Sequence, residues 1–151
     1  MAASATVLCN NVLIRAKQEN IDVSPMKLQK LLYYVCVSHV KRTGRSPISE
    51  QFEVWRYGPV LPSVYAEFRQ FGAKPIKRFA SDASGKSQMV DEDYNPVLKS
   101  CIDYVWNMFK SYSGVALSQK THMPGSGWYA AYQNNEDTIT TQEMKEDCTI
   151  E

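Results

Sequence analysis

The fold of this chain is decided by residues 52–71, which read F-E-V-W-R-Y-G-P-V-L-P-S-V-Y-A-E-F-R-Q-F. The first six residues alternate between two faces, and this period of two predicts a short strand. Gly58 tolerates a positive φ angle, and Pro59 forces an extended conformation on the residue before it. The strand is therefore expected to end in a sharp bend.

After the bend, the same stretch predicts an amphipathic helix. Pro62 and Ser63 begin it, and Gly72 is placed to cap its C-terminus. Its apolar residues recur at i, i+4 and i+7, as Val64, Phe68 and Phe71. The segment from Trp55 to Val60 holds no nucleophile, no paired carboxylates and no metal ligands. Such a segment suits packing or protein recognition, so we expect a protein that is not an enzyme.

Length and composition are those of one globular domain, residues 1–151. Charged residues make up 22% of the chain and hydrophobic residues 44%, which is ordinary for a soluble protein. The longest apolar stretch, Leu31 to Val37, is too short to span a membrane. The N-terminus has neither a basic region nor a cleavable apolar core. We therefore predict no signal peptide, no membrane partner and a cytoplasmic location.

The cysteines point to neither a disulfide framework nor a metal site. There are four, with no C-x-x-C pair: Cys9, Cys36, Cys101 and Cys148. The first three fall on apolar faces of predicted helices, where a free cysteine behaves as a small hydrophobe. Cys36 and His39 could form half a metal site, but no second pair completes it. We predict no metal and no cofactor.

The net charge of +1 hides an asymmetry between the C-terminal end and the rest of the chain. Residues 134–151 contain six acidic residues and one lysine, whereas the rest contains 16 basic and 10 acidic residues. Such an end is either a solvated last helix or a segment that contacts a basic partner or its own body. We expect it to modulate partner binding, so a chain ending after Gln133 should stay folded.

The remaining chain predicts further helices and weaker strands. Helices are expected at about residues 4–19, 24–44, 95–112, 115–122, 128–132 and 140–147. The one beginning at Asn95-Pro96 is expected to be the longest. Residues 76–79 and 88–90 could be two more short strands beside Phe52–Trp55. The predicted fold class is mainly α, a compact single-domain helical bundle of about six to seven helices with a small β element.

Four stretches of this sequence resemble a known family, the phage- and prophage-associated GepA-type proteins, whose domain is called Panacea. They are S-P-M-K-L-Q-K-L-L-Y-Y (24–34), F-E-V-W-R-Y-G-P-V-L-P-S-V-Y (52–65), L-S-Q-K-T-H (117–122) and G-S-G-W-Y-A-A-Y (125–132). The match extends over about residues 5–147. In many members a proline stands where this chain has Gly127, so we expect a looser backbone before Trp128.

The resemblance implies an antitoxin of a toxin–antitoxin pair. Members of the family pair with a toxin gene and neutralise its product, usually by direct protein–protein binding. In at least one branch the antitoxin also delivers its toxin to a protease. Many members carry an extra N-terminal DNA-binding region. The first helix of this chain already belongs to the domain, so regulation of transcription through such a region is not expected.

The candidate partner-binding residues are aromatic residues and their neighbours in these stretches, because Trp and Tyr dominate interface energetics. They are Lys27, Lys30, Tyr33, Tyr34, Trp55, Tyr57, Gly58, Pro59, Val60, Tyr65, His122 and Trp128. Tyr33 and Tyr34 are about 100° apart on one helix, so at least one is expected near the surface. Lys27 and Lys30 form a polar strip beside them, which is usually a solvated helix face. Trp55 and Trp128 are each expected in the core more than at the surface.

We predict that the toxin binds a face containing Tyr33 or Tyr34 together with the corner from Tyr57 to Val60. A hydrolase built on Ser118 and His122 would need an orienting acid and oxyanion donors, and none is visible.

A nucleic-acid-binding phage regulator is an alternative, with a basic patch of Lys41, Arg42, Arg45, Lys74, Lys77 and Arg78. The near-neutral charge of the chain argues against it. A phage inhibitor of a host defence protein is another alternative, and it would use the same kind of surface.

Overall fold

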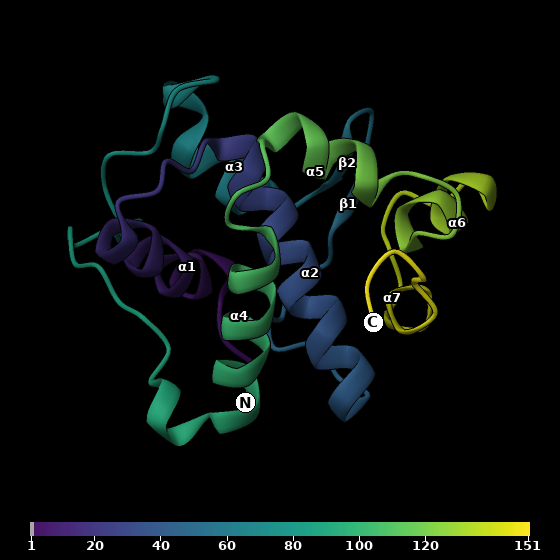
Figure 1. The fold of residues 1–151 in the computed structure, drawn as a ribbon, viewed down its shortest axis with the longest axis horizontal. Coiled ribbons are helices and arrows are strands. Elements are labelled where there is room, and N and C mark those ends of the chain that lie inside the picture. Colours follow the sequence, from purple (N-terminus) through teal and green to yellow (C-terminus); the bar gives the residue numbers. More distant parts are fainter. Residues whose placement is uncertain (1) are drawn as a thin grey trace.

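The long helix α2 (Pro25–Thr43) is the axis of the molecule, and most of the other helices pack around it (Figure 1). The computed structural model describes residues 2–151. The hydroxyl of Ser24 caps the start of α2 by accepting from the backbone N–H of Lys27, and Gly44 ends it at a φ of 79°. Thirteen of its 19 residues are buried. Such a helix is covered on more than one side, so several side chains that were expected at the surface are buried.

The predicted fold class is confirmed, because residues 2–151 form seven α-helices and one small antiparallel sheet. The other helices are α1 (Ala5–Glu19), α3 (Pro62–Phe68), α4 (Pro96–Phe109), α5 (Gly114–Thr121), α6 (Gly127–Gln133) and α7 (Thr141–Lys145). One 3-10 turn, Arg69–Phe71, follows α3, and another, Glu92–Tyr94, precedes α4. The longest helix is α2 and not α4, which ends at Phe109.

Serine and threonine side chains cap the starts of most helices. Ser4, Ser113 and Ser126 each accept a hydrogen bond from a backbone N–H in the first turn of the helix that follows. Thr140 and Glu143 form the reciprocal capping box at the start of α7. These side chains satisfy backbone donors that would otherwise have no partner.

The predicted strand is part of a tight hairpin of β1 (Glu53–Trp55) and β2 (Gly58–Val60). Its register pairs Glu53 with Val60 and Trp55 with Gly58. The outer edge of β1 is covered by the C-terminal part of the chain. The N–H of Val54 donates to the carbonyl of Asp137, and the N–H of Ile139 donates to that of Phe52, both at 2.9 Å.

The predicted strands at residues 76–79 and 88–90 are wrong. This segment is an extended loop that two asparagines hold against α1. The amide of Asn10 donates to the carbonyls of Ala80 and Gln88, and the amide of Asn11 donates to that of Val90. Both side-chain oxygens also accept from the loop, at Ala80 and Val90. The asparagine amides thus replace the hydrogen bonds that a neighbouring strand would make.

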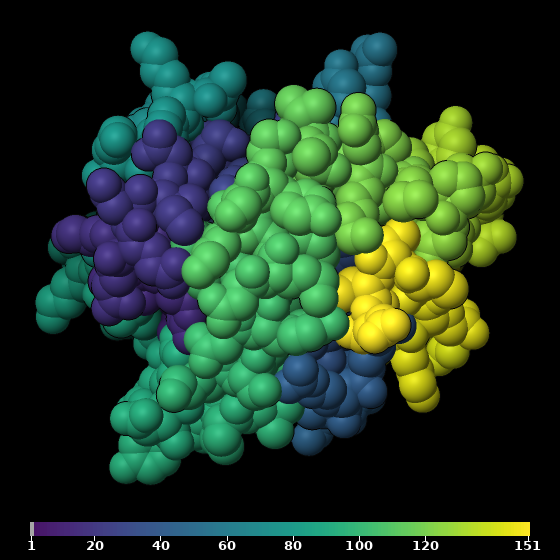
Figure 2. Space-filling view, in the orientation of Figure 1, coloured from purple at the N-terminus to yellow at the C-terminus, as the bar shows by residue number. Residues whose placement is uncertain are grey.

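The expectation that residues 134–151 contribute little to the fold is also wrong. Ile139, Met144 and Ile150 are buried, and Asp147 is 1% exposed. In Figure 2 this segment (yellow) lies directly beside α4 and α5 (green), and its helix α7 contacts α2. A count of charges could not show that one of the six acidic residues points inward.

The three cysteines at 9, 36 and 101 are free and buried, whereas Cys148 is exposed. Burial raises the pKa of the Cys9 thiol to about 12 and raises that of Cys36 above its ordinary range. Across the described chain no helix is both long and apolar enough to cross a membrane. Within the same residues there is no group of three or more His, Cys, Asp or Glu side chains that could hold a metal ion.

Candidate partner-binding groove

Side chains from three other parts of the chain bind the backbone of the β1–β2 hairpin. The indole N–H of Trp128 donates to the carbonyl of Trp55 at 2.8 Å. The hydroxyl of Ser118 donates to the carbonyl of Tyr57. The ammonium of Lys30 donates to the carbonyl of Pro59 at 2.9 Å. The four stretches that suggested the family therefore meet at one hairpin.

Gln29 completes this arrangement where the hairpin leads into α3. Its amide N–H donates to the carbonyl of Leu61 at 3.0 Å, and its amide oxygen accepts from the N–H of the same residue at 2.8 Å. All four atoms of this double hydrogen bond are buried. Buried, satisfied hydrogen bonds fix the position of the backbone more strongly than exposed ones.

Gly58 is required by both conformation and space. Its φ of 118° lies in the region that L side chains rarely adopt. A Cβ atom here would lie 3.0 Å from the hydroxyl of Thr121 and 3.2 Å from Cε of Lys30. Gly58 and Pro59 are both buried, so they shape the hairpin and do not offer a contact surface.

The predicted solvated strip of Lys27 and Lys30 is wrong, because both side chains are buried. The ammonium of Lys27 donates to the carbonyl of Lys110 at the C-terminal end of α4. Lys30 is 2% exposed, and burial lowers its pKa from the ordinary value to about 7. Their long stems pack inside while each amine binds a carbonyl, which a helical-wheel pattern does not reveal.

The expectation that Tyr33 or Tyr34 lies near the surface is wrong, because both are 0% exposed. The hydroxyl of Tyr33 donates to Asp147 at 2.6 Å, and that of Tyr34 is 2.8 Å from the hydroxyl of Thr149. The ring of Tyr34 stacks on Phe109 with centroids 4.9 Å apart. Burial raises the pKa of both phenols above their ordinary value. The C-terminal segment and α4 bury these residues, and neither contact is visible in the helix's own pattern.

A groove of about 420 Å³ opens between the hairpin, α3 and the first turns of α2. Its aromatic walls are Trp55, Tyr57 and Tyr65. Tyr57 is 56% and Tyr65 44% exposed, whereas Trp55 is half-buried. The rings of Trp55 and Tyr65 contact edge to face, with centroids 4.9 Å apart. Val60 and Lys30 also line this groove, so it brings together five of the predicted site residues.

His122 and Trp128 lie beside the hairpin but outside this groove. Trp128 is buried, as expected, and its ring is flanked by His122 at 5.3 Å and Tyr132 at 5.1 Å. Nδ1 of His122 carries a proton, because it bonds the carbonyl of Ser118, which can only accept. The hydroxyl of Ser118 is directed to the hairpin and not to His122. The arrangement is that of a structural contact and not of a nucleophile and its base.

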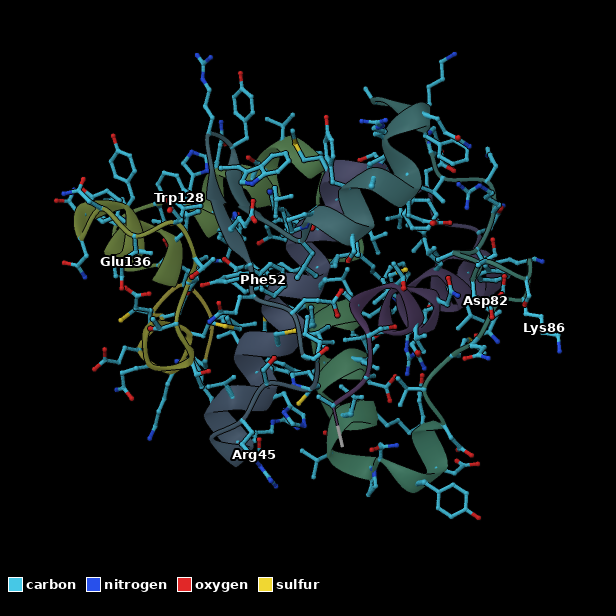
Figure 3. The ribbon with its side chains drawn as sticks, turned by 180° about the vertical axis from the view of Figure 1, so that it is seen from behind. Arg45, Phe52, Asp82, Lys86, Trp128 and Glu136 are labelled. Carbon is cyan, nitrogen blue, oxygen red and sulfur yellow. The ribbon has the colours of Figure 1, made fainter. Side chains whose placement is uncertain are left out.

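The six basic residues of the nucleic-acid alternative do not form one patch. Lys41, Arg42 and Arg45 lie at the C-terminal end of α2. The other three lie near its start, because the N–H of Ile76 donates to the carbonyl of Val23. Figure 3 shows Arg45 at the end of α2 far from Trp128 and the hairpin. Two separated groups do not make the continuous basic surface that backbone phosphates require.

The predicted loose backbone before Trp128 is wrong. The N–H of Gly127 donates to the carboxylate of Asp147 at 2.9 Å, and the hydroxyl of Ser126 caps the helix. A Cβ atom on Gly127 would lie 2.5 Å from the hydroxyl of Tyr33. Sequence reasoning missed Asp147 here, and it missed Arg56 and Arg69, which line the groove. The position of Arg69 one turn after Tyr65 was the available signal for the latter.

The chain belongs to the family of SocA-like antitoxins with a Panacea domain. The model of this family, described as "Antitoxin SocA-like, Panacea domain", matches residues 28–129. The chain is similar to Antitoxin SocA of Caulobacter vibrioides (strain NA1000 / CB15N), with 36% identity over 75 residues. This alignment covers 50% of the chain and 40% of that relative. No solved structure matches the chain significantly. The family membership confirms the resemblance inferred from the four stretches.

Proposed function

We propose that this protein neutralises a protein toxin by binding it directly, and that the rim of the groove is the contact surface. The observation that carries the proposal is the pair of exposed tyrosines, Tyr57 and Tyr65, on a backbone fixed from inside. Interfaces gain most of their energy from a few aromatic or arginine residues in such places. Family membership supplies the class of partner.

The rigidity of the hairpin supports this role. Exposed aromatic side chains on a flexible loop would lose conformational entropy on binding, which lowers affinity. Here the carbonyls of Trp55, Tyr57 and Pro59 each accept a hydrogen bond from a side chain outside the hairpin. The contact surface is therefore formed before the partner arrives. We further propose that the protein acts without catalysis and in the cytoplasm.

Growth rescue tests the proposal. The probe is the product of the gene next to this one, expressed from an inducible promoter in cells that also express the antitoxin. Wild type should restore growth, and the variant with Tyr57→Ala and Tyr65→Ala should not. Tyr94→Ala is the matched control, because Tyr94 is 85% exposed and precedes α4, away from the groove.

Circular dichroism should show that all three proteins are folded. Normal rescue by the double variant would exclude the groove as the toxin-binding surface. Loss of rescue by Tyr94→Ala as well would show that the effect is not specific to the groove.

A further inference from the structure

The groove carries positive charge that nothing within it balances. Two arginines, Arg56 and Arg69, line it together with the buried amine of Lys30, and its lining contains no aspartate or glutamate. Over residues 2–151, the ion pairs join Arg15 to Glu92 and Asp103, Arg78 to Glu67, and Lys110 to Glu19. None of them involves a groove residue. Unpaired charge beside exposed aromatic rings is typical of a surface that binds a partner of opposite charge.

The two arginines approach the aromatic walls from different elements. Arg56 lies in the turn between β1 and β2, and its guanidinium carbon is 5.4 Å from the ring centroid of Tyr57. Arg69 begins the 3-10 turn after α3, four residues beyond Tyr65, so both project from the same side of that element. Both arginines are exposed. A ligand lying across Tyr57 and Tyr65 would thus be within the range of two guanidinium groups.

The nearby acidic side chain does not neutralise them. Glu53 on β1 accepts the indole N–H of Trp55 at 2.8 Å and does not line the groove. Below the rings, the amine of Lys30 has the carbonyl of Pro59 as its only hydrogen-bond partner among the described residues. Lys30, Arg56 and Arg69 therefore present N–H donors to the groove, and no carboxylate lines the groove to accept from them.

We propose that the groove takes an acidic segment of the protein partner, with an aspartate or glutamate carboxylate at the arginines and an apolar neighbour against Tyr57 and Tyr65. The proposal rests on the proposed function, because it names the chemistry of the toxin surface that this site binds. Arginine binds carboxylate with two parallel hydrogen bonds, which gives both strength and orientation. Val60, Met26 and Pro25 supply the apolar surface beside the charges.

A single-stranded nucleic acid would also offer negative charge and flat rings, and the structure favours the acidic peptide. A site for single-stranded nucleic acid has a row of basic residues that follows the sugar-phosphate backbone over several nucleotides. The basic residues at Arg42 and Arg45 lie at the opposite end of α2 from the groove, and the whole chain carries a net charge of only +1. The groove is a local cationic site with apolar walls and not the end of such a row.

The test is a titration with two synthetic peptides. Binding is monitored by NMR, through the signals of the indole N–H of Trp55 and the backbone N–H of Tyr57. One peptide has six residues that alternate leucine and glutamate, with both ends blocked. The other has glutamine in place of each glutamate. The acidic peptide should shift both signals and bind at least tenfold more tightly than its glutamine counterpart, because only the former pairs with the arginines.

Two protein variants make the result specific. Arg56→Glu with Arg69→Glu should lower the affinity for the acidic peptide about tenfold or more, because like charges then face each other. Arg45→Glu makes the same kind of change at an exposed position far from the groove (Figure 3) and should have no effect. Equal binding of both peptides, or equal binding by wild type and the double variant, would overturn the proposal. So would a single-stranded oligothymidylate that binds the groove more tightly than the acidic peptide.

This outcome is separate from that of the rescue test. If Tyr57→Ala with Tyr65→Ala abolishes rescue while the peptides show no preference for acid, the antitoxin function stands and the acidic partner segment is wrong. If rescue is unaffected, the toxin-binding role of the groove fails, whatever the peptides show.

Discussion

Asp147 joins three parts of the chain through one buried carboxylate. One oxygen accepts from the hydroxyl of Tyr33 on α2 and from the N–H of Gly127 at the start of α6. The other accepts from the N–H and hydroxyl of Thr149. No cation pairs with it in the described chain. A buried carboxylate is tolerated when hydrogen bonds replace its lost hydration, and here four donors do so.

Asp147→Asn should therefore lower the free energy of unfolding by about 2–4 kcal/mol, since an amide N–H₂ would face donors in place of an acceptor. Urea denaturation followed by circular dichroism measures this. The matched control is Asp137→Asn, because Asp137 is exposed and uses only its backbone carbonyl. An unchanged urea midpoint in Asp147→Asn would contradict the role given to this carboxylate.

Gly127→Ala should cost about 1–3 kcal/mol of stability through the clash with the hydroxyl of Tyr33. In the background of Tyr33→Phe that hydroxyl is gone, and the same alanine should cost less. A double-mutant cycle from four urea curves gives the coupling between the two positions. Equal costs of the alanine in both backgrounds would show that the hydroxyl of Tyr33 is not what excludes a Cβ atom at Gly127.

Lys30 makes stability depend on pH in a defined window. Its pKa is about 7 in the fold and ordinary in the unfolded chain, so between these values only the unfolded chain binds the proton. The free energy of unfolding should rise from pH 7 to 8.5, by at most on the order of 1 kcal/mol per pH unit. Lys30→Met lacks this contribution, so the difference between the two proteins should change with pH. A constant difference would contradict a neutralised buried amine.

At the scale of elements, the sequence predicted the features that depend on interactions between neighbouring residues, such as the starts of the helices. The helices begin at serine, threonine and proline residues, which favour helix starts, as at Ser24 and Thr140. The failures came where distant segments supply the hydrogen bonds. Asn10 and Asn11 bind residues 80–90 across 70 to 79 positions of sequence. Their side chains supply the hydrogen bonds that the expected strands would have taken from a sheet. The three-residue strand β2 was too short to show a period.

The C-terminal segment is the element whose role the structure reverses. It adds Asp137–Ile139 to the edge of β1, buries Met144 and Ile150, and places Asp147 under Tyr33. Full burial of each aliphatic side chain contributes about 1.5–3 kcal/mol. Removing residues 134–151 also uncovers two tyrosines and the edge of the hairpin.

A chain ending after Gln133 should therefore lose its cooperative thermal transition or melt at least about 15 °C lower than the full chain. Differential scanning calorimetry of the two proteins decides this. A shortened chain that keeps the transition of the full chain would restore the earlier expectation that this segment only modulates binding. A change that leaves the length intact, Glu151→Gln, is the control, because that side chain is exposed.

At the scale of the whole molecule, the motif residues divide into an inner and an outer set. Lys30, Ser118 and Trp128 fix the hairpin backbone from inside, and Gln29 fixes Leu61, which follows the hairpin. Tyr57 and Tyr65 remain outside and exposed. Sequence patterns placed both sets in the same motifs and could not separate them. The separation depends on which faces of α2 the hairpin, α4 and the C-terminal segment cover, and these contacts are long-range.

The most direct test of the central claim is the dissociation constant between this protein and its purified toxin, measured by isothermal titration calorimetry. Replacing two central aromatic anchors, Tyr57→Ala and Tyr65→Ala, should cost about 3 kcal/mol or more, which is over a hundredfold in affinity. Tyr94→Ala, at an exposed tyrosine outside the groove, should bind within about twofold of wild type. A double variant that is folded and binds the toxin as tightly as wild type would contradict the claim that this groove is the toxin-binding surface.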